Sequence, residues 1–163
     1  MPLGEVRDAF ESTIRGAGLS ITDEALDLAA QSTGGYPYMI QLVGYNMWRM
    51  ARRRTNGLGL SISLDDVSVG AEQARAKLGE GVCAPVIKQL SDRAVDYVTA
   101  MAQDDGPSST AEVAARMAES MDYANIYRRR LIEDHIITSP ARGFVDFAIP
   151  FLREYLRSLR RPE

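Results

Sequence analysis

Apolar residues recur at helical spacing along the first half of the chain. Val6, Phe10 and Ile14 fall on one helical face at intervals of four residues. Thr22 is a suitable N-cap for a second helix. Ser63 and Asp66 have the spacing of a capping box, in which two side chains satisfy backbone N–H groups at the start of a helix. Helices are therefore predicted over about residues 4–16, 23–32, 37–54 and 64–78. The first half is expected to be a small bundle of three or four short helices.

The segment from Thr33 to Leu42 joins the second and third predicted helices. Gly34 and Gly35 permit a tight bend at almost no steric cost. Pro37 falls near the first turn of the next helix, where its missing N–H is harmless and its fixed φ is already helical. These residues alone fit two interpretations of the segment, an ordinary helix–helix corner and a functional turn.

The third predicted helix ends in a basic cluster formed by Arg49, Arg52, Arg53 and Arg54. Cations at a helix C-terminus are favoured by the helix dipole, so a solvated helix end explains the cluster. The alternative is a phosphate contact, to nucleotide or to nucleic acid, because arginine suits bidentate phosphate binding.

The pattern of the second half changes from helical spacing to a β-rich alternation. Ser91 is a suitable N-cap for one helix, and Ser109 and Glu112 have capping-box spacing for another. Helices are predicted over about 85–90, 91–103 and 122–134, with one more opening at 109, and strands over 135–139 and 144–149. His135 is expected at the start of the first strand rather than in a functional role, and Pro150 at the start of a last helix.

Three helices followed by a β-hairpin are the order of a winged helix-turn-helix. The glycine-rich stretch Gly79–Gly81 lies between the two patterns and is predicted to be a hinge. The predicted fold is therefore mainly α, with two domains: a helical, lid-like bundle over 1–80 and a winged helix-turn-helix domain with a short hairpin over 81–163.

Composition narrows the classes of function. The 163 residues carry a net charge of −3, so any nucleic-acid surface is expected to be a local patch. The one cysteine, Cys83, excludes an internal disulfide and fits the reducing cytoplasm, where we expect the protein. No apolar run approaches the roughly 20 residues of a membrane span, and no signal-peptide pattern is present, so no membrane partner is expected.

Catalytic signatures are missing from the sequence. One histidine and one cysteine cannot supply the usual four nitrogen and sulfur ligands of a zinc site. There is no G-x-x-x-x-G-K-S/T phosphate loop, no G-x-G-x-x-G and no G-x-S-x-G nucleophile elbow. We therefore predict no catalytic residue, no metal and no cofactor held by this chain alone, and expect that it is not an enzyme.

The candidate DNA-binding residues are Asn125, Tyr127, Arg128 and Arg129 in the predicted third helix, and Arg142 in the turn of the hairpin. In a winged helix this helix enters the major groove, where asparagine can read adenine and arginine can read guanine. The same residues also fit a solvated helix face, since acidic residues flank the cluster, and many winged helices serve only as protein-contact or autoinhibitory modules.

The turn at Gly35, Tyr36 and Pro37 resembles the Gly-x-Pro motif in the lid of AAA+ and STAND-like P-loop ATPases. The helix–hairpin order and residues 147–152 resemble the C-terminal winged-helix region of such ATPases of the prokaryotic origin-recognition-like type. The resemblance covers about residues 4–160. It implies that the turn lies near the adenine of ATP or ADP held by a P-loop core, which this sequence lacks.

Two hypotheses for the function stay open. In the first, the chain is the lid and winged-helix module of such an ATPase, a fragment or a stand-alone relative, and binds duplex DNA through the winged helix. In the second, it is a regulatory protein–protein module that packs on an ATPase core, in cis or in trans, without binding DNA. In both, the chain by itself is expected to bind ATP or ADP weakly or not at all, because phosphate affinity needs the missing loop.

Overall fold

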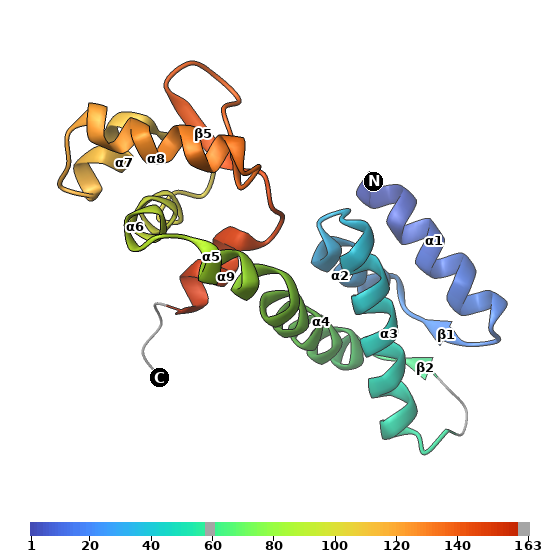
Figure 1. Ribbon diagram of the computed structural model, residues 1–163. Helices are drawn as coiled ribbons and strands as arrows, with labels where there is room; N and C mark the ends of the chain where they lie inside the picture. The colour runs from blue at the N-terminus through green and yellow to red at the C-terminus, as the bar shows by residue number, and fades with distance from the viewer. Residues whose placement is uncertain (58–60, 160–163) are drawn as a thin grey trace. The chain divides into compact units, whose positions relative to one another are not determined.

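The computed structural model describes residues 1–57 and 61–159. The chain divides into two compact units, Met1–Leu78 and Gly79–Glu163 (Figure 1). The described residues are mainly helical, with a small three-stranded antiparallel sheet in the second unit. The predicted mainly α fold, a helical bundle followed by a winged helix, is confirmed.

The first unit contains the four predicted helices and a strand pair. Its elements are α1 (Leu3–Gly16), β1 (Ser20–Ile21), α2 (Asp23–Thr33), α3 (Pro37–Arg54), β2 (Ser61–Ile62) and α4 (Leu64–Leu78). The two-residue strands β1 and β2 pair in parallel, with Ser20 opposite Ser61 and Ile21 opposite Ile62. This pairing ties the loop before α2 to the loop before α4.

Two predicted N-caps of the first unit are confirmed. The Thr22 hydroxyl accepts a hydrogen bond from the Ala25 N–H at 3.3 Å. At the start of α4 the Ser63 hydroxyl accepts from the Asp66 N–H at 3.2 Å, and the Asp66 carboxylate accepts from the Ser63 N–H at 2.9 Å. Both helices therefore begin where their side chains satisfy free backbone donors.

The closest helix packing in the first unit is between α3 and α4. A Cβ atom added at Gly70 would lie 2.6 Å from the backbone nitrogen of Met47, so only glycine fits there. Val43 and Met47 of α3 are buried at this side of the helix, as are Val67 and Ala71 of α4. The backbone contact at Gly70 thus sets the distance between the two helices.

The second unit has the element order of a winged helix-turn-helix. It contains the π-helical turn η1 (Gly79–Cys83), α5 (Ala84–Gln89), α6 (Asp92–Met101), β3 (Ser108–Ser109), α7 (Thr110–Arg116), α8 (Met121–Glu133), β4 (Ile137–Thr138), β5 (Phe144–Phe147) and α9 (Leu152–Leu159). The strands are ordered β3-β5-β4, all antiparallel, so the wing is the loop between β4 and β5. Helices α6, α7 and α8 pack together on buried residues that include Tyr97, Val98, Met101, Val113 and Leu131.

Of two predicted helix starts, one is right and one is wrong. Helix α7 begins directly after Ser109, as predicted, but the Ser109 side chain makes no capping hydrogen bond, and its backbone pairs with Phe144 in the sheet. The last helix begins at Leu152 rather than at Pro150, since Phe151 has a left-handed φ of +63° that breaks the helix between them. The connection from β5 to α9 therefore delays the last helix by two residues.

Two predicted chain breaks differ from the structure in local conformation. The division into units falls after Leu78, next to the predicted hinge, but Gly79–Gly81 is helical, within η1, and a Cβ atom at Gly79 would lie 2.8 Å from the ring of Tyr155. Gly79 therefore makes room for a side chain of α9. His135 is not a strand residue: it has a φ of +56° directly after α8, and β4 begins two residues later at Ile137.

Substituting Gly70 by alanine tests the α3–α4 contact. Because the added methyl meets backbone rather than a movable side chain, we expect Gly70→Ala to destabilise the first unit by about 1–3 kcal/mol. Gly4→Ala is the control, since nothing lies within 4 Å of a Cβ at Gly4 and alanine favours helix by about 1 kcal/mol or less. Urea unfolding followed by the fluorescence of Trp48, the only tryptophan, reports on this unit. Equal midpoints for the two variants would contradict the steric account.

Candidate nucleic-acid interface

Helix α8 begins after a tight turn that follows α7. Ala118 has a φ of +55° in this turn, and the Ser120 hydroxyl then caps α8 by accepting from the Tyr123 N–H at 3.2 Å. Ala124 and Leu131 face the core with exposed fractions of 3% and 1%. The opposite side of α8 is therefore open to solvent.

Three predicted DNA-binding residues lie together on that open side. Asn125, Arg128 and Arg129, with Asp122 one turn earlier, line an open hollow of about 420 Å³. Arg129 is exposed, whereas Asn125 and Arg128 are half-buried. The hollow presents an amide, two guanidinium groups and one carboxylate, which suits hydrogen bonding to a polar, partly anionic surface.

Tyr127 is engaged within the unit. Its hydroxyl shares a hydrogen bond of 3.1 Å with that of Tyr123, and the two rings meet edge to face with centroids 5.4 Å apart. This hydrogen bond raises the pKa of Tyr127. The guanidinium of Arg130 lies 6.0 Å from the centroid of the Tyr127 ring. The Tyr127 hydroxyl is therefore engaged by Tyr123 rather than free to bind a partner.

Arg128 connects α8 to the wing. Its Nη2 donates a hydrogen bond to the Ser139 hydroxyl oxygen at 3.1 Å. The Ser139 hydroxyl in turn donates to the Phe144 carbonyl oxygen at 3.0 Å, across the base of the wing. The Nε of Arg128 and the hydroxyl of Tyr97 are buried without a hydrogen-bond partner. Burial raises the pKa of Tyr97 to about 12. Arg128 is thus partly a structural residue, which its sequence position did not reveal.

Arg142 lies in the wing loop and is exposed. The next residue, Gly143, takes a φ of +80° and its carbonyl oxygen accepts from the Thr110 N–H at 2.9 Å, so the wing is anchored at the start of α7. Among residues 1–57 and 61–159, neither Arg129 nor Arg142 has a hydrogen bond or ion pair from its guanidinium. Within the described residues, α8 therefore presents Arg129, and the wing presents Arg142, as exposed cations without an ion pair.

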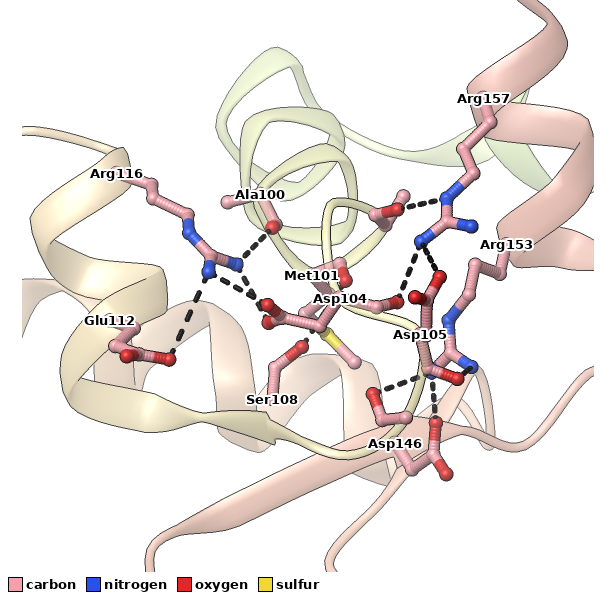
Figure 2. A network of polar contacts seen from close by, with 12 residues as sticks. Ala100, Met101, Asp104, Asp105, Ser108, Glu112, Arg116, Asp146, Arg153 and Arg157 are labelled. Atoms are coloured by element: carbon pink, nitrogen blue, oxygen red, sulfur yellow. Dashed lines mark hydrogen bonds and ion pairs between the residues drawn. The ribbon is translucent and has the colours of Figure 1, made fainter.

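A polar network holds the turn between α6 and β3 (Figure 2). Arg116 of α7 donates to both carboxylate oxygens of Asp104 at 2.7 Å and to the Ala100 carbonyl at 3.0 Å. The hydrogen bonds from Arg116 lower the pKa of Asp104 below its usual value. The Ser108 hydroxyl donates to the Met101 carbonyl at 3.2 Å. This side of the network fixes α7 to the end of α6.

Two arginines of α9 hold the same turn from its other side. Arg157 donates to the Ala102 carbonyl at 2.6 Å, and Arg153 donates to the Gly106 carbonyl at 2.9 Å (Figure 2). Arg153 also pairs with the carboxylate of Asp146 in β5. These contacts place α9 and the sheet relative to α7, and they were not predicted from the sequence.

The predicted nucleotide-contact residues form the turn between α2 and α3. Gly35 has a φ of +73°, its N–H donates to the Thr33 hydroxyl at 3.1 Å, and the Tyr36 N–H donates to the Thr33 carbonyl at 3.0 Å. Pro37 is the first residue of α3, as predicted. The Met1 amino group donates to the Gly35 carbonyl at 3.1 Å, and the Met1 carbonyl lies 2.1 Å from where a Cβ of residue 35 would be. Met1 therefore packs on this turn, and no side chain larger than glycine fits there.

The basic end of α3 is partly used in the fold. Arg54 donates to the buried carboxylate of Asp66 at 2.8 Å, and Arg49 donates to the Gln73 side chain at 2.7 Å. Burial raises the pKa of Asp66, but the hydrogen bonds from Arg54 and Ser63 outweigh it, so the pKa is lowered overall. Arg54 thus acts as a structural partner of the α4 capping box.

Comparison with known proteins matches residues 80–156 to a domain of unknown function, DUF8462. The matched range covers most of the second unit, from η1 into α9. No curated protein matches the chain. Over the part that the structure describes, no helix is long and apolar enough to cross a membrane, and no group of three or more His, Cys, Asp or Glu residues is placed to hold a metal ion.

Replacing Asp104 by asparagine tests the network that positions α7. We expect Asp104→Asn to destabilise the second unit by about 1–2 kcal/mol at neutral pH, because Arg116 loses its charged partner. The pKa of Asp104 is lower in the folded chain than in the unfolded chain, where it is about 3.9. The ionised carboxylate therefore stabilises the fold at pH values above about 3.9, and this stabilisation is lost as the pH falls through the pKa of the folded chain. The difference in melting temperature between wild type and variant should therefore become smaller at acid pH.

Calorimetry of the full chain between neutral and acid pH measures this difference. Asp105→Asn is the matched control, since the Asp105 side chain is 95% exposed and its exposed ion pair is worth about 1 kcal/mol or less. If both variants melt alike at every pH, Asp104 has no special role in the turn.

Proposed function

We propose that this chain is the C-terminal lid and winged-helix module of an AAA+/STAND-like P-loop ATPase, and that its winged helix binds duplex DNA. The observation that carries the DNA assignment is the pair of exposed cations, Arg129 on α8 and Arg142 on the wing, which have no ion-pair partner among the described residues. A winged helix contacts DNA with these two elements.

The geometry supports different roles for the residues of this face. Asn125 and Arg129 line the hollow on α8, where they can reach base edges or phosphates in the major groove. Arg142 would contact phosphate or the minor groove from the wing. Arg128 positions the wing through Ser139 and adds positive charge beside the hollow.

The lid assignment rests on the turn at Gly35, Tyr36 and Pro37. Its left-handed glycine and the proline at the first position of α3 have the geometry that a Gly-x-Pro turn needs. In the proposed parent protein, a P-loop core would hold ATP or ADP and this turn would form part of the wall beside the base. The chain itself would supply no catalytic group, and the module would work in the cytoplasm.

The second candidate function is a regulatory protein–protein module that packs on an ATPase core. It is favoured by apolar side chains exposed near the same surface, namely Met121 at 41%, Ile126 at 37% and Phe144 at 43%. Asp122 also lies in the hollow and would repel phosphate. This alternative requires that the chain show no DNA affinity above background.

Fluorescence anisotropy of a labelled random duplex tests the DNA proposal. We expect the full chain to bind, and the affinity to fall steeply between about 50 and 200 mM salt, because bound phosphates release counterions. The double variant Arg129→Glu/Arg142→Glu should bind about 10- to 100-fold more weakly.

The matched control is Arg75→Glu/Lys88→Glu, which changes the net charge equally at exposed positions on α4 and α5. It should bind nearly as well as wild type. Equal losses in the two double variants would show that only net charge matters, and no binding at 50 mM salt would favour the protein–protein module.

A further inference from the structure

Helix α3 exposes large aromatic side chains on the side away from its buried residues. Tyr38 and Tyr45 are 42% and 52% exposed, and Trp48 is half-buried one turn further along. Tyr38, Tyr45 and Arg52 are seven residues apart in turn, so they lie along one side of the helix. The Tyr45 and Trp48 rings have centroids 6.5 Å apart.

Three cations are held over these rings. The Lys77 ammonium of α4 lies 5.3 Å and the Arg49 guanidinium 5.8 Å from the centroid of the Tyr45 ring. The Arg52 guanidinium lies 5.3 Å from the centroid of the Trp48 ring. We call Tyr45, Trp48, Arg49, Arg52 and Lys77 the aromatic–cation face.

The positive charge of this face is not neutralised locally. Within the described part of the chain, no carboxylate lies within ion-pair distance of Arg49, Arg52 or Lys77. Some other arginines of the same unit are paired: Arg7 contacts three carboxylates, and Arg54 contacts Asp66. The exposed cations Arg52 and Lys77 are therefore available to an external anion, whereas Arg49 already donates to Gln73.

We infer that the aromatic–cation face is a docking surface for an acidic segment of a partner protein. Tyrosine, tryptophan and arginine are the residues that most often dominate binding energy at protein interfaces. The cations are preorganised over the rings, which reduces the ordering cost when carboxylates approach them.

The geometry favours an acidic protein segment over single-stranded nucleic acid. Proteins that bind single strands offer aromatic faces on which bases stack. Here the Tyr45 ring already carries two cations and the Trp48 ring carries Arg52. The groups left to bind a partner are the charged heads, which match carboxylates in sign and in hydrogen-bonding capacity.

A fluorescence titration of the full chain with a synthetic oligoglutamate peptide tests this inference. Trp48 is the only tryptophan and belongs to the face, so its emission reports binding at this place. We expect a saturable change in emission that weakens with added salt. No change in Trp48 emission at low salt would overturn the inference.

Two charge reversals on α4 provide a matched pair. Lys77→Glu should raise the dissociation constant of the peptide at least about fivefold, since it places a repelling charge on the face. Arg75→Glu is exposed on the same helix but belongs to no contact of the face, so it should change the constant by less than about twofold. Equal effects of the two reversals would overturn the inference.

A short oligothymidylate strand, titrated under the same conditions, separates the two classes of anion. If it changes Trp48 emission at lower concentration than the peptide does, the face is a nucleic-acid surface and the inference is wrong. The outcome is independent of the duplex experiment, because Arg129 and Arg142 are in the other unit.

Discussion

Three arginines converge on one short turn, and the winged helix depends on them. Residues 102–106 connect α6 to the sheet, and their carbonyl groups and Asp104 need hydrogen-bond donors. Arg116 supplies them from α7, and Arg153 and Arg157 supply them from α9 (Figure 2). The turn thereby joins elements that are distant in sequence. With α7, α9 and β5 placed in this way, α8 and the wing are left facing solvent.

The arginines of this chain divide into two groups with different roles. Arg54 and Arg116 are bound to carboxylates or carbonyl groups and contribute to the fold. Arg129 and Arg142 have no such partner in the described residues and remain available for binding. Arg128 belongs to both groups, because it holds the wing through Ser139 while lining the hollow on α8. The net charge of −3 does not reveal which arginines belong to which group.

The helices and three of their caps could be predicted because they depend on local pattern: Thr22, Ser63 and Ser91 cap the helices that they precede. Ser109 precedes α7 as predicted, but its side chain makes no capping hydrogen bond, and its backbone pairing with Phe144 is a contact that its sequence neighbours do not reveal. The π-helical turn at Gly79 could not be predicted because the glycine is required by a distant residue: a Cβ atom there would clash with the ring of Tyr155. The candidate residues could be predicted from their residue types. Only the fold shows which arginines are hydrogen-bonded within the chain and which have no partner among the described residues.

The central claim is that α8 and the wing form a DNA-binding face. Its most direct test is to follow the backbone amide resonances of the isotopically labelled full chain by nuclear magnetic resonance during titration with a short duplex. The account predicts salt-sensitive shifts concentrated in α8 around Asn125 and Arg129 and in the wing around Arg142, with α3 unchanged. Shifts concentrated on other elements, or none at low salt, would contradict it.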